Sequence, residues 1–271
     1  TVRAAFERNL LKPAYRTYLE MDQCTCNESN WIAAVAGGAI TAACAVLGDE
    51  GDSNALEPYL TGCFYKLRAH VDVAFGGDSA CLEGFGYASG TMWIYSAVLP
   101  VIERCLGVDL SGKMHRSYVE MFWAGDHRKK EYYTFGDARF GAPTSSAFPW
   151  LVEKYRDPEL AWFLDLLPPE PNYVSYHTML YDPSDVPRKE PELSGAKWFK
   201  KTGTVVFRSG NELNPFVFTF RCGPFGNHQH LDQGGFLLAD RGELLVTEQE
   251  YSDYYEDPIY QSHIIQPVGH N

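Results

Sequence analysis

A proline-rich segment divides this sequence into two parts whose apolar residues repeat with different periods. Six prolines fall between Leu167 and Glu192, and proline removes a backbone donor and prevents a helix from continuing. Before this segment apolar residues recur at every third and fourth position, whereas after it apolar and polar residues alternate. We therefore predict an α+β chain, with a helical part over residues 1–195 and an antiparallel sheet over residues 196–271.

The two periods also predict where individual elements lie. Helices are expected over residues 31–47, 56–74, 88–106, 114–123, 145–155 and 158–167. Ser111 is placed to cap the fourth of these helices. Strands rich in β-branched and aromatic residues are expected over residues 204–208, 215–221, 235–239 and 243–247.

Charge and hydropathy argue against two classes of partner. The 271 residues carry 23 basic and 35 acidic side chains, a net charge of −12, which is unfavourable for binding nucleic acid or an anionic membrane surface. The longest apolar stretch, residues 31–47, is shorter than the roughly 20 residues that span a bilayer. We expect no nucleic-acid partner and no membrane span.

The densest polar cluster is Asn227-His-Gln-His-Leu-Asp-Gln233, which lies between two predicted strands. In an extended segment His228 and His230 point to the same side, so their imidazoles converge on one point or serve two neighbouring tasks. Two solvated loop histidines are the alternative. A metal site would need a third ligand, for which Glu248 and His270 are available, and such a set suits Zn²⁺ and also allows Mn²⁺.

Two further polar groups stand where loops lead into predicted helices. Asn30-Trp31 opens the most apolar helix, and Glu83-Gly-Phe-Gly-Tyr87 opens another. Backbone N–H groups at such junctions face outward and favour an anion. The alternatives are that Asn30 is a simple N-cap and that Tyr87 is a core aromatic with a hydrated hydroxyl.

These motifs, together with Phe135-Gly-Asp137 and the terminal Gly269-His270-Asn271, occur in the order seen in the heparinase II/III-like polysaccharide lyases, which the chain resembles over nearly its whole length. It is also similar to the dermatan sulfate epimerases, which share that architecture. The resemblance implies an (α/α) toroid followed by an antiparallel β-sandwich, of which this chain would hold the later helices and the first strands. Members are usually longer, so a fragment or processed product is expected, with a periplasmic or secreted location favoured.

The resemblance implies β-elimination on a uronic-acid-containing, anionic polysaccharide or oligosaccharide. The matching positions give Asn30 to the uronate carboxylate, Tyr87 to the leaving glycosidic oxygen, and His228 to the role of base or carboxylate donor. Further substrate contacts are expected at Trp31, Glu83, Asn227 and Tyr251. No oligomeric state is implied.

The resemblance also implies a metal beside this site. His230 matches the metal-binding histidine of the family, with Glu248 and His270 as companions and His263 in reserve. A Zn²⁺ or Mn²⁺ ion there would brace the surface beneath His228 and not perform the elimination.

Two other functions stay open on the same fold. A uronate C5-epimerase would share the proton abstraction but return a proton to the other face of C5, and a non-catalytic module would only bind glycan. A two-carboxylate glycoside hydrolase is less favoured, because no pair of acidic residues stands at the helix starts.

An acidic protein that acts on an anionic polymer needs cations within its cleft. Arginine holds carboxylate or sulfate with two parallel hydrogen bonds, so we predict that some of Arg68, Arg139, Arg208 and Arg221 line the cleft, with Arg208 as a substrate contact. The alternative is that these arginines pair with the abundant aspartates and glutamates.

Overall fold

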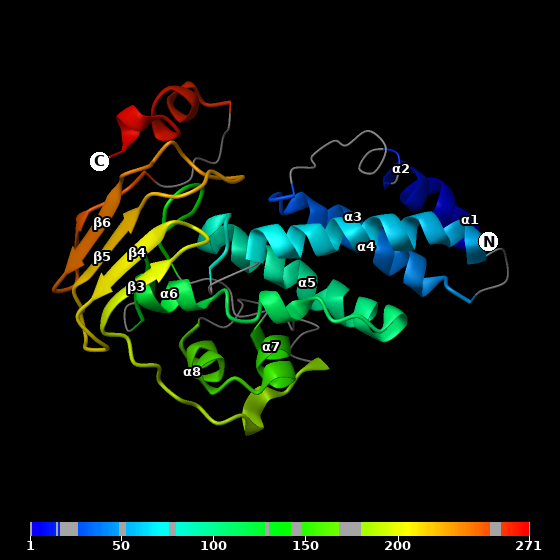
Figure 1. Cartoon of the computed structure of the whole chain (residues 1–271), viewed down its shortest axis with the longest axis horizontal. Helices are drawn as coiled ribbons and strands as arrows, with labels where there is room; N and C mark the ends of the chain where they lie inside the picture. Colours follow the sequence, from blue (N-terminus) through cyan, green and yellow to red (C-terminus); the bar gives the residue numbers. More distant parts are fainter. Residues whose placement is uncertain are drawn as a thin grey trace. The chain divides into compact units, whose positions relative to one another are not determined.

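The computed structural model describes residues 2–14, 16, 27–48, 53–75, 80–127, 130–141, 148–167, 180–249 and 256–270. The chain forms two compact units, Thr1–Gly76 with Thr91–Met114, and Gly77–Gly90 with His115–Asn271. Their elements are labelled in Figure 1. Helices together with antiparallel strands confirm the α+β prediction, whereas the division after residue 195 stays a prediction.

The first unit is built from helices. Its elements are α1 (Val2–Phe6), a π-turn (Glu7–Leu11), α2 (Lys12–Ala14), α3 (Trp31–Ala45), a 3₁₀ turn (Ser53–Leu56), α4 (Glu57–His70), a second π-turn (Val71–Phe75), the part of α5 (Gly84–Leu106) from Thr91 onward, and a 3₁₀ turn (Ser111–Lys113). The small residues of α3 permit close packing, since a Cβ at Gly37 would lie 2.9 Å from Cγ2 of Val98. None of the helices in the described ranges is long and apolar enough to cross a membrane.

The second unit combines helices with a sheet. Its elements are the start of α5, then α6 (Val119–Trp123), β1 (Gly125–Asp126), β2 (Glu131–Tyr132), α7 (Phe148–Tyr155), α8 (Pro158–Leu166), a 3₁₀ turn (Pro183–Asp185), β3 (Gly195–Phe199), β4 (Thr204–Arg208), β5 (Val217–Arg221), β6 (Phe236–Asp240), β7 (Glu243–Val246), a π-turn (Tyr260–Ile264) and a 3₁₀ turn (Pro267–Gly269). Strands β3 to β7 form one antiparallel sheet in chain order, and β1 pairs with β2.

Several predicted boundaries differ from the observed ones. The helix predicted from residue 114 begins at Val119, and Ser111 does not cap it. Instead, the N–H and the hydroxyl of Ser111 both donate to Oδ1 of Asp109, at 2.8 and 2.5 Å. Strand β3 lies outside the predicted strands, because its five residues alternate weakly and its conformation comes from pairing with β4.

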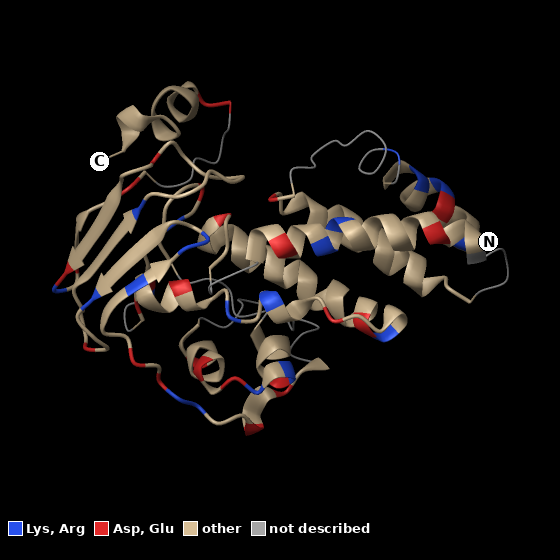
Figure 2. Ribbon diagram, in the orientation of Figure 1, with Lys and Arg blue, Asp and Glu red and all other residues tan. Residues whose placement is uncertain are grey.

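The two faces of the five-stranded sheet differ in their exposure to solvent. Alternate residues of β4, β5 and β6 are buried, namely Thr204, Val206, Arg208, Val217, Thr219, Arg221, Leu237 and Ala239. On the opposite face Trp198 and Phe207 are exposed. Figure 2 shows both basic and acidic positions among the strands of this sheet. One face therefore packs inside the unit and carries two of the four arginines that are candidates for a cleft, Arg208 and Arg221.

Both of these arginines are used inside the second unit. Arg208 donates through Nε to the carbonyl of Gly210 at 2.8 Å and through Nη1 to the carbonyl of Gly125. Burial lowers the pKa of Arg208. The Nε of Arg221 lies 3.5 Å from Oδ1 of the buried Asp232. Pairing with an acidic group therefore holds for Arg221, whereas a substrate contact at Arg208 stays a prediction.

Asp157 joins several elements of the second unit. Its Oδ1 accepts the backbone N–H groups of Glu159 and Leu160 at 3.0 and 3.2 Å, which caps α8. Its Oδ2 accepts the Tyr118 hydroxyl at 2.6 Å and Nη1 of Arg116 at 3.0 Å. Burial alone would raise the pKa of Asp157, but the side chain of His115, 3.3 Å away, and then these hydrogen bonds outweigh burial and hold the pKa well below the usual range.

We expect Asp157→Asn to lower the free energy of unfolding at pH 7 by about 1–3 kcal/mol, because a charged acceptor is lost. The unfolded chain binds this proton near pH 3.9 and the native chain only at lower pH, so the contribution is present above about pH 4 and is lost as the pH falls below it. Urea unfolding at pH 7 and pH 3 measures this effect: the difference in the free energy of unfolding between wild type and variant should be smaller at pH 3. The exposed Asp165→Asn is the control, and a gap that does not change with pH would contradict the prediction.

Candidate functional site

The two histidines of the polar cluster converge on one carboxylate. The loop between β5 and β6 is not extended, because His228 has a positive φ of 62°. Nevertheless, Nδ1 of His228 lies 3.1 Å from Oδ2 of Asp137, and Nε2 of His230 lies 3.0 Å from Oδ1 of the same residue. The expected convergence is therefore present, but a left-handed turn produces it.

Asp137 is the centre of this arrangement. Besides the two histidines, it accepts the hydroxyl of Tyr260 at 2.8 Å. Burial would raise the pKa of Asp137, but the three hydrogen bonds outweigh burial and lower it to about 2. An ionised Asp137 accepts a proton-bearing Nδ1 from His228, which leaves Nε2 of that ring as the nitrogen with a lone pair.

The backbone holds this carboxylate against the loop. The N–H of Asp137 donates to the carbonyl of His228 at 2.9 Å. The preceding residue, Gly136, has a φ of 75°, and a Cβ there would lie 2.6 Å from that same carbonyl oxygen. Only glycine permits this approach, so the Phe135-Gly-Asp137 step has a mechanical reason.

Tyr87 stacks on His228. Their ring centroids are 3.4 Å apart and the ring planes differ by 9°. Tyr87 lies in the first turn of α5 and is half-buried. The structure thus brings together two of the three residues predicted to move protons or to bind the carboxylate.

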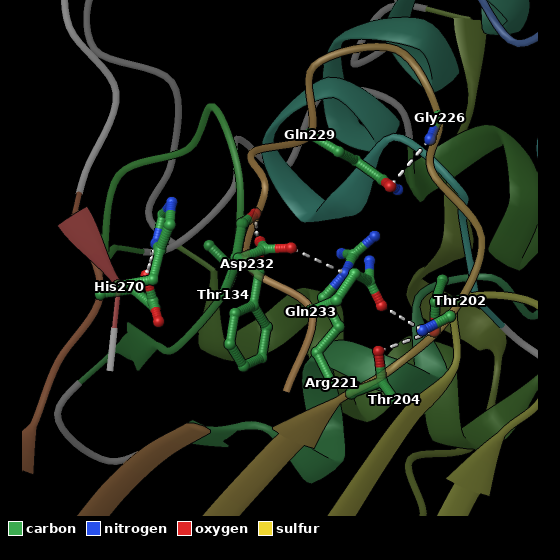
Figure 3. A network of polar contacts seen from close by, with 12 residues as sticks. Thr134, Thr202, Thr204, Arg221, Gly226, Gln229, Asp232, Gln233 and His270 are labelled. Carbon is green, nitrogen blue, oxygen red and sulfur yellow. Dashed lines mark hydrogen bonds and ion pairs between the residues drawn. The ribbon is translucent and has the colours of Figure 1, made fainter. Parts of the chain in front are cut away.

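Polar contacts fasten the loop to the start of α5. Nδ2 of Asn227 donates to the buried Glu83 at 2.8 Å. The side chain of Gln229 accepts the N–H of Gly226 at 2.8 Å (Figure 3) and donates to the carbonyl of Leu82. Glu83 and Asn227 therefore hold each other, and their expected substrate contacts stay predictions.

The predicted metal ligands lie near one another in the second unit. Nδ1 of His270 is hydrogen-bonded to Oε2 of Glu248; a dashed line at His270 marks this contact in Figure 3. The ring centroids of His230 and His270 are 5.4 Å apart. Each of these histidines has a carboxylate on one ring nitrogen. The other nitrogen, Nδ1 of His230 or Nε2 of His270, is buried and makes no hydrogen bond of normal geometry with the residues that the structure describes. Such carboxylate-bound imidazoles are typical metal ligands, so the chemistry of the residues fits.

The side chains are not arranged as a finished metal site. Across the described ranges no three His, Cys, Asp or Glu side chains are grouped closely enough to hold an ion. Burial would lower the pKa of His270, but Glu248 outweighs it and raises the pKa, and burial raises the pKa of Asp232 despite Arg221. His263 is exposed.

Other predicted residues lie elsewhere. Asn30 and Trp31 belong to the first unit; Asn30 makes no side-chain cap, and Trp31 is 52% exposed. Tyr251 falls outside the described residues. Arg68 and Arg139 are exposed. The roles predicted for these five residues stay predictions.

Sequence reasoning missed Tyr260 and assigned no role to Asp137. Asp137 stands in the Phe135-Gly-Asp137 motif, and in that motif Gly136 is the sequence signal for a close backbone approach beside Asp137. Tyr260 is separated from Asp137 by 123 positions in the chain, and no spacing rule connects the two.

No protein-family model matches the chain, and no curated protein matches it. Solved structures do: a heparinase III is 15% identical over 84% of this chain and 36% of its own, with a TM-score of 0.61. A mutant heparan sulfate lyase from Pedobacter heparinus is 15% identical over 84% of this chain and 34% of its own, with a TM-score of 0.60. A second heparinase III is 16% identical over 96% of this chain and 38% of its own, with a TM-score of 0.62. The chain spans little more than a third of the length of these proteins. The chain therefore has a heparinase III-like fold.

Proposed function

We propose that the chain carries the catalytic site of a polysaccharide lyase that cleaves a uronic-acid-containing, anionic glycan by β-elimination. The observation that supports this most directly is the stack of Tyr87 on His228, with His228 hydrogen-bonded to the ionised Asp137. A hydroxyl and an imidazole side by side supply the acid and the base that elimination needs. The fold, shared with a heparan sulfate lyase, favours a glycosaminoglycan as the substrate.

The reaction can be written on these two side chains. Nε2 of His228 takes the C5 proton, the C5 electron pair forms the C4=C5 double bond, and the bond from C4 to the leaving oxygen breaks. The Tyr87 hydroxyl gives its proton to that oxygen, and the imidazolium then returns a proton to the phenolate. Asp137 stabilises the imidazolium in the meantime, because it is a buried negative charge at Nδ1.

The finer features of the family belong to the same proposal. Hydrogen-bond donors must neutralise the uronate carboxylate before C5 becomes acidic, and we assign this task to Asn30. We assign substrate contacts to Trp31, Glu83, Asn227 and Tyr251. The helices would be part of an (α/α) toroid over residues 1–195, and the sheet would be part of a β-sandwich over residues 196–271.

Incubation with a panel of uronate polymers, heparan sulfate first, tests the proposal. Lyase action creates an unsaturated uronate that absorbs in the ultraviolet, so a rise in absorbance is expected. Incorporation of deuterium at C5 from the solvent without absorbance would instead indicate a C5-epimerase. Retention on the polymer with neither signal would indicate a binding module and would overturn the proposal.

We also propose a divalent cation, Zn²⁺ or Mn²⁺, at His230, Glu248 and His270. The support is a pair of buried imidazole nitrogens that make no hydrogen bond of normal geometry within the described part of the chain, each in a ring held by a carboxylate on its other side. A bound cation would supply a fixed positive charge that braces the loop beneath His228. The cation would not take part in the elimination itself.

We expect chelator-treated protein to take up one Zn²⁺ per chain and to gain about 2.7 kcal/mol of stability at a hundredfold excess of metal over Kd. Elemental analysis and thermal unfolding measure both effects. His230→Ala and His270→Ala should each abolish uptake, whereas the exposed His263→Ala should not. Equal uptake by the His230→Ala/His270→Ala double variant would rule out this site.

A further inference from the structure

A cavity of about 200 Å³ in the second unit shares no lining residue with the Tyr87–His228 site. Asp126, His127 and Arg208 line it and are buried, whereas Glu190 and Glu212 line it and are exposed. The buried residues therefore form the floor of the cavity, and the two glutamates lie at its mouth.

His127 is the unusual member of this floor. Its ring is only 7% exposed, yet neither ring nitrogen makes a hydrogen bond of normal geometry with any of the residues that the structure describes. Burial, and next the charge of Arg208, lower the pKa of His127 to about 3, so the ring is neutral and offers one donor and one acceptor. Leaving buried polar groups without hydrogen bonds is unfavourable, and a ligand in the cavity would supply the missing hydrogen bonds.

The other lining groups define the chemistry of that ligand. Trp162 lines the cavity and packs edge-on to His127, with centroids 5.5 Å apart, so it offers apolar aromatic surface. Three carboxylates against one guanidinium give a net charge of −2, which opposes an anion. Hydroxyl groups both donate and accept, so they can satisfy the carboxylates, the imidazole and the guanidinium together.

We propose that this cavity binds a single neutral sugar ring, with His127 and Arg208 bound to its hydroxyls and Trp162 against its C–H face. The volume equals that of about six or seven water molecules at ~30 Å³ each, which suits one ring and not two. The site is separate from the elimination site and does not depend on the chemistry proposed there. In this proposal Arg208 binds a neutral sugar, whereas the net charge of the chain predicts that it contacts an anionic one.

Side-chain ¹⁵N spectra of the histidines test this directly, with methyl β-glucoside as the neutral probe and glucuronate as the anionic one. Methyl β-glucoside should shift the His127 resonances and leave those of His228 in place. Glucuronate should bind about tenfold more weakly, because the carboxylates repel it. No shift of His127 with either probe, or equal affinity for both, would overturn the proposal.

Variants separate binding from general damage to the fold. Trp162→Ala should weaken methyl β-glucoside about tenfold, whereas Trp198→Ala, which removes an exposed tryptophan of β3, should not. Glu212→Gln changes only an exposed residue and should reduce the difference in affinity between methyl β-glucoside and glucuronate. The matched Glu243→Gln on β7 should leave that difference unchanged. Equal effects of Glu212→Gln and Glu243→Gln would count against the site even if Trp162→Ala fails to fold.

Discussion

Tyr87→Phe should lower kcat on a susceptible uronate polymer by roughly 10²–10⁴-fold while KM changes only a few-fold. The variant deletes the hydroxyl that would protonate the leaving oxygen, and a positioned acid contributes about that factor. The phenyl ring still stacks on His228, where the centroids are 3.4 Å apart, so binding surface and loop position are retained. Loss confined to kcat is the signature of an interaction made only in the transition state.

Steady-state kinetics by ultraviolet absorbance measure this effect. Tyr65→Phe is the matched control, because Tyr65 is 61% exposed on α4 and the substitution removes the same atom. If both variants keep wild-type turnover, Tyr87 is not the acid. A variant with unchanged kcat and a large rise in KM would assign Tyr87 to substrate binding alone.

Asp137→Asn is expected to lower kcat by about 10⁴-fold, the size of the loss that the same replacement produces beneath a catalytic histidine. The same replacement beneath a catalytic histidine acts by stabilising the wrong tautomer, and here Asp137 accepts from Nδ1 of His228 at 3.1 Å. The new amide would donate toward one imidazole, so the nitrogen intended as base would carry the proton. Positioning, and not contact with substrate, is the role assigned to Asp137.

A tautomer readout distinguishes this role from simple loss of stability. The ¹⁵N shifts of His228 should change from the Nδ1–H to the Nε2–H form in Asp137→Asn at a temperature where the variant is folded. Tyr260→Phe, which removes the hydroxyl that donates to the same carboxylate, should keep the tautomer and lose only a few-fold in kcat. An unaltered tautomer with full activity in Asp137→Asn would refute the role.

The order of helices and strands follows from local patterns, and local patterns predicted most of it. Helix α3 and strands β4 to β7 lie within one or two residues of their predicted positions, because each carries an apolar period of its own. Strand β3 has no such period and depends on its neighbour β4. The Ser111 cap is wrong because the Ser111 hydroxyl donates to Asp109 and the helix begins only at Val119.

The candidate site could be predicted only in part, because its residues come from distant positions. Tyr87 and His228 stand in motifs that the sequence displays, but their stacking depends on the fold. Asp137 lies 91 positions from His228 and Tyr260 a further 32 beyond it, and periodicity carries no information on such pairs. The left-handed backbone of His228 could not be predicted either, because histidine adopts a positive φ only rarely and nothing in its sequence neighbourhood requires one.

The hydrogen bond from the backbone N–H of Asp137 to the carbonyl of His228 has a consequence in time. This amide can exchange its hydrogen with deuterated solvent only while the loop and the segment of Asp137 are apart, so its protection measures the free energy of their separation. The carboxylate that orients the imidazole belongs to the same residue, and each parting therefore also releases the ring. The protection of this one amide would thus report how much of the protein holds His228 aligned when no substrate is present.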